Sequence, residues 1–539
     1  MKPLCFVAVV VALLPLAVDA ADRPNVLICI SDDQSFPHAS VYGTTAVSTP
    51  GFDRVARQGV LFHNAFTPAP GCSPMRASLL TGRYIWQNGP AGTHASSFPK
   101  SLQAFPDQLE SAGYAVGYTG KGWGPGNWKD SGRSRNPAGP SYSDLKVRPK
   151  PAKGIRDTDY AANFESFLKQ RDKEQPFCFW YGGSEPHRTY DPGIGRRNGI
   201  PLDEIQVPGF LPDNKIVRSD LADYLYEIQW FDSHLVRMLD HLESTGQLKN
   251  TLVIVTSDNG MPFPRAKANL YEFGIHMPLA ISWPQRFRGG KQTSALVNLI
   301  DLTATIYDAT AVDPPGGESA LAGRSLLPRL AKPGSPGREA VFSGRERHSS
   351  SRFNTLGYPC RAARTDRFLY IRNYHPQRWP AGAPRRYQDA RFDEGGRFVD
   401  GRLSPPHSGY HDIDAGPTLT NMTARLPGDQ NHPLLDKAVA FRPAEELYDV
   451  IVDPACLSNL AEDAKHAKDL ERLSSLLEAK LTETGDVRQI DPENAEVWER
   501  YPRYSSLRWF PVPDWLDDPS HAAAPMPWLE SRRPRVDSR

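Results

Sequence analysis

Apolar and polar positions divide the first part of the chain into short strand-like runs and longer helical segments. Continuous apolar runs of this kind are typical of strands buried on both faces of a parallel sheet. They cover residues 25–30, 114–118, 176–181 and 251–256. Helical spacing or helix-start signals fall between them, over residues 50–59, 102–112 and 221–242. Strands that alternate with helices predict an α/β fold with a mostly parallel sheet flanked by helices.

A different pattern begins near residue 340. Strand-like segments at 368–372 and 446–450 are followed by a charged segment of helical character over 461–484. This order predicts a smaller C-terminal α+β subdomain. We therefore expect an α/β domain over 21–340, the α+β subdomain over 341–500, and a tail rich in proline and tryptophan over 501–539.

The first 20 residues have the pattern of a secretory signal peptide. Lys2 supplies the positive start, residues 7–16 are apolar, and small residues at 17–20 suit cleavage. We expect an exported protein, in a secreted, periplasmic or lysosome-like compartment; a buried N-terminal helix is the alternative. The apolar run is too short to cross a bilayer and no later segment is suitable, so no membrane span is predicted.

Charge and cysteine content narrow the class of protein. The 539 residues carry a formal net charge of +1, which gives no electrostatic bias toward nucleic acid. Of the six cysteines, Cys5 lies in the predicted leader, and the others show no close paired spacing. Neither a zinc site nor a disulfide framework is therefore predicted. An odd number of cysteines in an exported chain points to a special role for one of them.

Acidic and amide side chains follow two of the predicted strands. Asp32 and Asp33 come after the run at 25–30, and Asp258 and Asn259 come after the run at 251–256. In α/β folds, functional groups gather beyond the carboxyl ends of the strands. Oxygen ligands without histidine or cysteine favour a hard cation such as calcium. Taken singly, each cluster could equally be a helix cap or a loop carboxylate.

The segment 71–83 carries the most specific chemistry of the chain. Cys72 is followed by Pro74 and Arg76, and the segment ends in Leu-Leu-Thr-Gly-Arg. A lone cysteine near proline and arginine is more often a packed thiol, but the whole segment resembles the signature of the type I, formylglycine-dependent sulfatases. Met75 is a departure, because a small residue is usual there.

Two further segments carry the same resemblance. The sequence Ser-Asp-Asn-Gly-Met-Pro-Phe-Pro over 257–264 continues through Lys267 to 269–271, and 446–449 has the form usual near the C-terminal end of sulfatases. The Pro-Phe-Pro insert is unusual among sulfatases and is similar to that of the branch acting on N-sulfated glucosamine. The resemblance covers residues 24 to about 462.

The resemblance implies an alkaline-phosphatase-like fold and a set of site residues. Cys72 would be converted to formylglycine by a formylglycine-generating enzyme, and its hydrate would attack sulfur. Arg76 would hold that hydrate, Lys121 and Lys267 would bind sulfate oxygens, and His187 would protonate the leaving group. A calcium ion would be held by Asp32, Asp33, Cys72, Asp258 and Asn259. Outside this context, Lys121 and His187 would be interpreted as an ordinary turn lysine and loop histidine.

Two positions depart from the family pattern. Trp123 stands where a histidine usually follows the first sulfate-binding lysine, and tryptophan cannot accept a proton. Ser184 replaces a histidine often found three residues before His187. His94 and His348 are candidates to substitute for the missing base or to contact substrate.

The expected substrate is a sulfated carbohydrate, with the N-sulfated glucosamine of heparan-type glycans as the first choice. The alternatives are an O-sulfatase on another polysaccharide, a phosphoester or phosphonate ester hydrolase, and a glycan-binding protein with a disabled site. Aromatic and basic residues of the second region could contact a sugar or simply pack between domains. They are Arg347, Arg361, Arg372 and Trp379.

Overall fold

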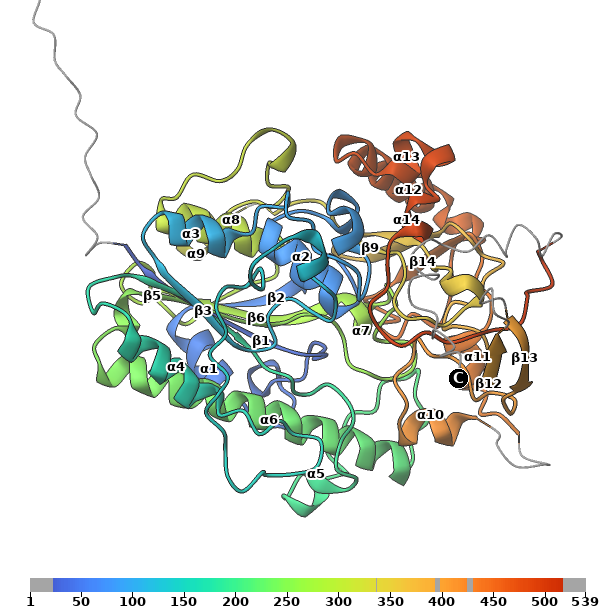
Figure 1. Cartoon of the computed structure of the whole chain (residues 1–539), viewed down its shortest axis with the longest axis horizontal. Helices are drawn as coiled ribbons and strands as arrows, with labels where there is room; N and C mark the ends of the chain where they lie inside the picture. The colour runs from blue at the N-terminus through green and yellow to red at the C-terminus, as the bar shows by residue number, and fades with distance from the viewer. Residues whose placement is uncertain (1–22, 336, 393–397, 424–429, 517–539) are drawn as a thin grey trace, which may run out of the picture.

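The computed structural model describes residues 23–335, 337–392, 398–423 and 430–516, and Figure 1 shows their arrangement. The predicted signal peptide over 1–20 and the last part of the predicted tail, from residue 517, lie outside the described residues. Residues 501–516 contact both predicted domains, since the Tyr504 N–H donates to the carbonyl of Ala95 and Arg503 Nη1 donates to the carbonyl of His348.

The larger part of the chain forms a mixed sheet. Its strand order is β3-β4-β1-β5-β6-β2-β7, and β8 also pairs with β2. Neighbours among β3, β4, β1 and β5 are parallel, whereas β6 is antiparallel to β5 and β2. The strands are β1 Asn25–Ser31, β2 Val60–Phe66, β3 Ala115–Gly120, β4 Phe177–Gly182, β5 Thr251–Ser257, β6 His276–Ser282, β7 Lys291–Thr293 and β8 Val297–Asn298. The predicted strands therefore form the parallel half, and the α/β prediction is confirmed.

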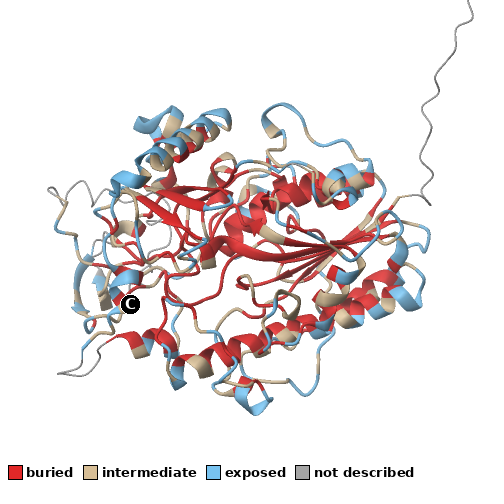
Figure 2. Ribbon diagram, turned by 180° about the vertical axis from the view of Figure 1, so that it is seen from behind, coloured by how far each residue is buried: buried red, intermediate tan, exposed pale blue. Residues whose placement is uncertain are grey.

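Helices cover both faces of this sheet, as Figure 1 shows. Alternate residues of β1 serve the two faces: Val26, Ile28 and Ile30 pack in one core, Leu27 and Cys29 in the other. The core on the first side is closed by α2 Cys72–Thr81, α3 Phe105–Ser111 and α8 Asp301–Thr310. The core on the second side is closed by α1 Pro50–Gln58, α4 Tyr160–Gln170 and α6 Lys215–Ser244. The sheet is buried on both faces (Figure 2), as its apolar runs predict.

Two predicted helices have different bounds in the structure. The helix expected over 102–112 begins at Phe105, because Pro106 lacks the N–H that would bond back to residue 102 and fits only the first turn. The helix expected over 221–242 begins earlier, at Lys215, where the Asn214 side chain accepts hydrogen bonds from the N–H groups of Ile216 and Val217.

The second region is built around an antiparallel sheet of order β14-β11-β10-β9. Its strands are β9 Val341–Arg345, β10 Cys360–Arg364, β11 Phe368–Asn373 and β14 Glu445–Asp449. The predicted charged helix is α12 Ala467–Glu483, which buries Leu473, Leu477 and Leu481. A separate hairpin joins β12 Tyr387–Phe392 to β13 Phe398–Leu403. The shorter helices are α5 Ile194–Arg197, α7 Glu272–Ile275, α9 Leu327–Ala331, α10 Pro417–Met422, α11 Leu434–Val439, α13 Val487–Ile490 and α14 Val497–Arg500.

Candidate active site

The parallel strands deliver polar side chains to one edge of the sheet. The register pairs Ser31 with Ser257, so the residues after β1 and β5 emerge side by side. Gly120 likewise pairs with Gly182, and the chain continues to Lys121 after β3 and to His187 after β4. The backbones of β4 and of the residue after β3 lie very close together here, since a Cβ on Gly182 would lie 1.9 Å from the Lys121 carbonyl oxygen. Only glycine permits this approach.

Three carboxylates meet at this edge. Asp32, Asp33 and Asp258 are buried, and each offers an oxygen within 4.8 Å of the others. Asn259 Nδ2 donates to Asp33 Oδ1 at 2.8 Å, whereas Asn259 Oδ1 is buried and finds no hydrogen-bond partner in the described structure. A buried amide oxygen that is left without a donor beside three carboxylates fits a hard, oxygen-seeking cation such as Ca²⁺. The structure thus brings these four residues together, as the sequence pattern predicted.

Each carboxylate is also met by a cationic side chain. Arg76 Nε donates to Asp258 Oδ2 at 2.8 Å, and Lys121 Nζ donates to Asp32 Oδ1 at 2.7 Å. Lys267 Nζ lies 2.6 Å from Asp33 Oδ2. Burial, with the adjacent Asp32 carboxylate, still raises the pKa of Asp258. A divalent ion would remove this repulsion and leave the site with the positive excess that a sulfate anion needs.

Cys72 begins helix α2 and faces this cluster. Its side chain is 1% exposed, and Lys121, Lys267, Asp32 and Asp258 all influence its charge. Burial raises the pKa of the Cys72 thiol to about 11, so an unmodified cysteine here is protonated at neutral pH. Because the thiolate is the nucleophilic form, unmodified Cys72 is a poor nucleophile. A reaction at residue 72 would therefore need a nucleophile other than the native thiol.

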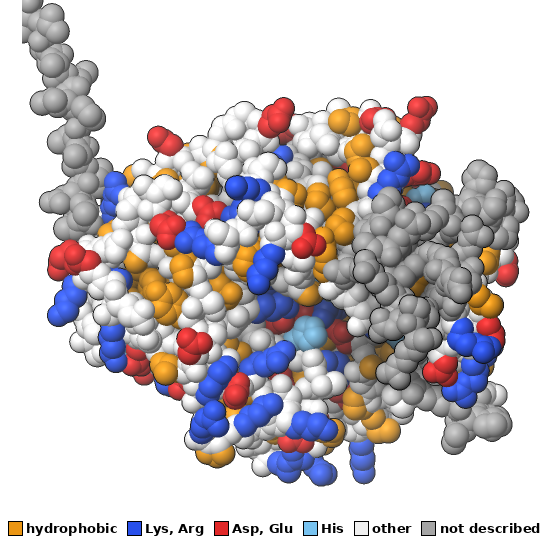
Figure 3. Space-filling view, in the orientation of Figure 1, with side chains coloured by type: hydrophobic (Ala, Val, Ile, Leu, Met, Phe, Trp, Pro, Cys, Tyr) orange, Lys and Arg blue, Asp and Glu red, His pale blue; other side chains and the backbone are white. Residues whose placement is uncertain are grey.

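His187 lies at the open side of the cluster. Its side chain is 36% exposed and its Nε2 lies 3.8 Å from Asp33 Oδ2. Nδ1 lies 2.6 Å from the Arg188 carbonyl oxygen. Since a carbonyl can only accept, Nδ1 carries a hydrogen and Nε2 is the nitrogen free to exchange a proton with a substrate. Figure 3 shows a histidine side chain in a hollow of the surface, with acidic and basic side chains around it.

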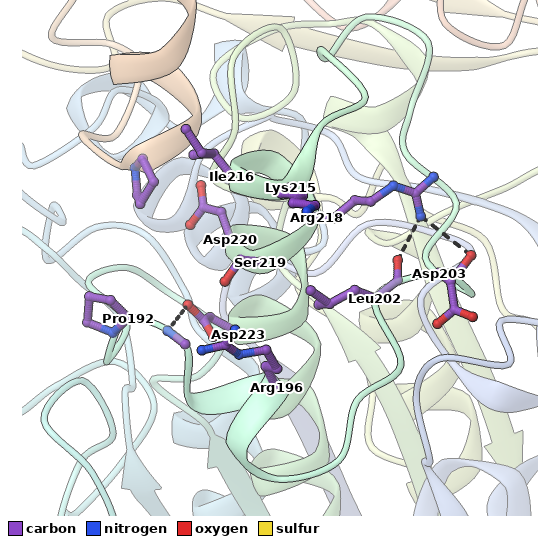
Figure 4. Close-up of a pocket in the computed structure, with 12 residues that line it drawn as sticks. Pro192, Arg196, Leu202, Asp203, Lys215, Ile216, Arg218, Ser219, Asp220 and Asp223 are labelled. Atoms are coloured by element: carbon purple, nitrogen blue, oxygen red, sulfur yellow. Dashed lines mark hydrogen bonds between the residues drawn. The ribbon is translucent and has the colours of Figure 1, made fainter.

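The neighbour of His187 fixes this loop. Arg188 Nη1 and Nη2 donate to the two Asp220 oxygens at 2.7 and 2.8 Å, and its guanidinium lies over the rings of Tyr190 and Phe263. Asp220 projects from α6 beside a separate hollow of about 820 Å³, which Figure 4 shows. None of the predicted site residues lines that hollow. The candidate site and this hollow are therefore distinct.

A buried carboxylate with a raised pKa lies on α6. Glu227 on α6 is 1% exposed, and neither of its oxygens has a hydrogen-bond partner in the described structure. Burial, and the nearby Glu185 carboxylate, raise the pKa of Glu227 to about 9. The folded state therefore keeps a proton that the unfolded chain releases near its ordinary pKa. The contribution of Glu227 to stability should therefore fall as pH rises from about 5 to about 9, by up to about 1.4 kcal/mol per pH unit.

We expect Glu227→Gln to remove the part of the pH dependence that Glu227 contributes, and to raise the melting temperature at pH 8 more than at pH 5. Thermal unfolding of the wild type and the variant at several pH values measures the effect. The exposed residue Glu204 provides a matched control, Glu204→Gln. Parallel pH profiles for wild type and Glu227→Gln would show that the Glu227 carboxyl titrates normally.

The structure also places the residues at the two departures from the family pattern. Trp123 is buried, packs edge-to-face on Phe98 and donates from Nε1 to the Ser73 carbonyl at 3.1 Å. Beside Cys72 there is instead His94, whose Nε2 lies 3.5 Å from Sγ. His348 packs against the His94 ring, with centroids 4.5 Å apart. His94 thus lies next to residue 72 and His348 packs on His94, and the roles of both are predictions.

Most of the residues considered for sugar contacts in the second region serve packing. Arg361 is fully buried between Glu346 and Asp486, with both ion pairs at 2.6 Å. Arg372 pairs with Glu478, and the buried Arg347 donates to the backbone at Tyr501 and Pro502. Trp379 stacks on Phe441. The packing interpretation therefore holds for the three arginines, because their donors are already engaged inside the protein.

Asp414 belongs to the site, although no pattern in the sequence indicated it. It lies between β13 and α10, and its Oδ2 is 2.8 Å from Lys267 Nζ. Asp33, His187 and Asp414 each offer an atom within 4.8 Å of the others. An isolated aspartate in a loop has no motif, so only the folded chain could reveal it.

Comparison with known proteins shows what the chain is similar to. The family model described as Sulfatase matches residues 24–312. Human N-sulphoglucosamine sulphohydrolase is 31% identical over 516 residues, covering 88% of this chain and 93% of the human protein. An ulvan-active sulfatase from Formosa agariphila is 23% identical over 497 residues, covering 86% of this chain and 76% of that protein.

Solved structures show the same fold. One, in complex with its substrate D-glucosamine-2-N,6-O-disulfate, has a TM-score of 0.60 at 21% identity, covering 88% of this chain and 99% of that one. A putative sulfatase from Bacteroides thetaiotaomicron has a TM-score of 0.59 at 20% identity, covering 87% and 94%. The alkaline-phosphatase-like architecture expected from the sequence is confirmed.

Proposed function

Because the chain belongs to the sulfatase family, we propose that it hydrolyses sulfate from a sulfated sugar, with N-sulfated glucosamine of a heparan-type glycan as the substrate. The human relative that is 31% identical is named for N-sulfoglucosamine. One structural neighbour was solved with a glucosamine carrying both N- and O-sulfate. The observation that carries the proposal is the convergence of Arg76, Lys121 and Lys267 with an oxygen-rich cation site beside Cys72.

Two groups would complete this site. The donor set of Asp32, Asp33, Asp258 and Asn259 suits calcium, which when bound supplies positive charge that lowers the pKa of an oxygen ligand and offsets sulfate charge. Formylglycine at position 72, made by a formylglycine-generating enzyme, would supply a hydrate with one hydroxyl to attack sulfur and a second to allow release of sulfate. A plain thiol lacks that second hydroxyl.

The remaining side chains have separable tasks. Lys121 and Lys267 hold the peripheral sulfate oxygens, where charge grows in the transition state. Arg76 anchors the nucleophile end, since it is fully buried and bonds to both Asp258 and the Lys121 carbonyl. His187 Nε2 gives its proton to the departing nitrogen or oxygen. Export is part of the proposal; among the described residues, no helix is long and apolar enough to cross a membrane.

A substrate panel tests the function. Purified protein, expressed with a formylglycine-generating enzyme, is assayed on N-sulfoglucosamine, glucosamine 6-O-sulfate, an aryl sulfate and an aryl phosphate. We expect N-sulfoglucosamine to give the highest kcat/KM. A preference for the 6-O-sulfate would indicate an O-sulfatase, and a preference for the aryl phosphate would indicate a phosphoester hydrolase. No turnover by protein shown to carry the aldehyde would favour a glycan-binding role.

His187→Asn tests the proton donor. Substrates whose leaving group is an amine or a sugar alcohol need that proton, so kcat/KM should fall about 100- to 1,000-fold. An aryl sulfate with an acidic phenol leaves without one and should lose less than about tenfold. Steady-state kinetics on both substrates measures the contrast. Equal losses on both would mean that His187 shapes the site without giving a proton.

A further inference from the structure

The loop that carries Asp414 is held in place by a buried ion cluster. Asp412, two residues earlier, is 2% exposed and accepts from Arg345 Nη2 at 2.5 Å and Arg352 Nη2 at 2.6 Å. It also accepts from the Ser349 N–H at 2.9 Å. The two arginines come from the second region, so that region fixes where Asp414 stands. The matched sulfatase segment ends at residue 312, which leaves Asp414 outside it.

Asp414 differs from the other carboxylates of the site. Its side chain is 29% exposed, whereas Asp33 is fully buried and Lys267 is 4% exposed. The ammonium of Lys267 lies between Asp33 and Asp414, at 2.6 and 2.8 Å from their oxygens. It therefore fills the position that a metal ion would need between these two carboxylates. One side of the Asp414 carboxylate is therefore used by Lys267, and the side chain is still open to a bound molecule.

A carboxylate at this position repels the sulfate group itself, so any contact of Asp414 with the substrate is made to another part of it. It offers only acceptor oxygens when ionised. Burial alone would raise the pKa of Asp414, but Lys267 and His187 lower it, and the net pKa lies below its ordinary value. What it can bind is a hydrogen-bond donor on the leaving-group side, where His187 stands.

We propose that Asp414 is a specificity-determining residue that accepts a hydrogen bond from the N–H of an N-sulfated amine. The proposal rests on the proposed function of this site. In a sulfamate, R–NH–SO₃⁻, the nitrogen has one hydrogen to give and one lone pair to receive a proton. An O-sulfate has a bridging oxygen with no hydrogen, so it cannot satisfy Asp414.

The spacing suits both contacts at one nitrogen. Two partners that each lie about 2.9 Å from a nitrogen of near-tetrahedral geometry are about 4.7 Å apart. The atoms offered by His187 and Asp414 lie no more than 4.8 Å apart, so both side chains can reach one nitrogen bound between them. The sulfamate N–H donates to Asp414 while His187 Nε2 protonates the lone pair. The nitrogen–sulfur bond breaks as an oxygen nucleophile forms the new oxygen–sulfur bond, and the overall reaction is R–NH–SO₃⁻ plus water giving R–NH₃⁺ and SO₄²⁻.

A matched pair of substrates tests this role. N-sulfoglucosamine and glucose 2-sulfate differ at the bridging atom, N–H in one and oxygen in the other. For Asp414→Ala we expect kcat/KM on N-sulfoglucosamine to fall about 10- to 100-fold, because a buried donor is left without its charged acceptor. The kinetic constant for glucose 2-sulfate, as substrate or as competitive inhibitor, should change less than about threefold, since it makes no such bond. Asp389→Asn, at an exposed position of the β12–β13 hairpin, is the control.

The outcomes separate the two levels of the proposal. If Asp414→Ala loses the same factor on both substrates, Asp414 only positions Lys267 or His187, and the specificity role is wrong. If the wild-type protein prefers glucose 2-sulfate, the proposed N-sulfate function itself fails, and the role of Asp414 with it. Partial recovery of the preference for N-sulfoglucosamine by Asp414→Glu would support an acceptor role, which a purely structural role does not predict.

Discussion

Cys72→Ser is expected to lose at least about 1,000-fold in kcat, the scale seen when a nucleophile is removed from a catalytic unit. A serine that stays unmodified has one hydroxyl, so it can form a sulfate ester but has no second hydroxyl for releasing sulfate. The buried position would not restore activity by ionising the hydroxyl, because burial disfavours the charged form and already raises the pKa of the native thiol to about 11. Steady-state assays of N-sulfoglucosamine hydrolysis measure the loss.

Two controls make this result specific. Cys178 is also buried, in strand β4 and away from the site, so Cys178→Ala should keep wild-type turnover. Peptide mass analysis of wild-type protein should show residue 72 about 18 Da lighter than cysteine, reflecting a change in covalent chemistry. Sustained turnover by a Cys72→Ser protein that mass analysis shows to lack the aldehyde would contradict the nucleophile assignment.

Removal of the cation is expected to have an effect of similar size. Asp258→Asn removes one of three converging carboxylates and the partner of Arg76 Nε, and we expect activity to fall at least about 100-fold. An ion that binds only the folded state also stabilises it, by about 2.7 kcal/mol at a concentration 100 times its Kd. Calcium should therefore raise the melting temperature of chelator-treated wild type and have much less effect on the variant.

The exposed Asp313 supplies the control, Asp313→Asn, which removes one negative charge outside the site. Its activity and its calcium-dependent stabilisation should match those of the wild type. Full activity of the wild type after exhaustive chelation, or an unchanged calcium response in Asp258→Asn, would contradict a cation held at this cluster.

The parallel half of the sheet was predictable because its strands are short, apolar and followed by polar residues. Residues 25–30 and 251–256 each lead into the carboxylate or amide groups that meet at the sheet edge, as the pattern indicated. Strands β2 and β6 were not predicted, although they complete the sheet. Their place depends on pairing between distant segments, which a local pattern does not contain.

Other parts of the fold and site could not be predicted because they contain charged residues that are buried only in the folded chain. Strand β10 contains Arg361 and Arg364, which suggest a solvent-exposed segment, but each is buried against carboxylates from distant positions. Asp414 could not be predicted either, because only the folded second region places it beside Lys267. Conversely, Trp123 was identified from the sequence as a departure from the family pattern, but the structure was needed to place His94 beside Cys72.

The most direct test is a crystal structure of the calcium-loaded, catalytically active protein. We predict one ion with oxygen ligands from Asp32, Asp33, Asp258 and Asn259 at about 2.3–2.6 Å, and a further oxygen ligand from a hydrated aldehyde at residue 72. An active protein whose ion lies elsewhere, or in which residue 72 remains a thiol turned away from these side chains, would contradict the proposed catalytic site.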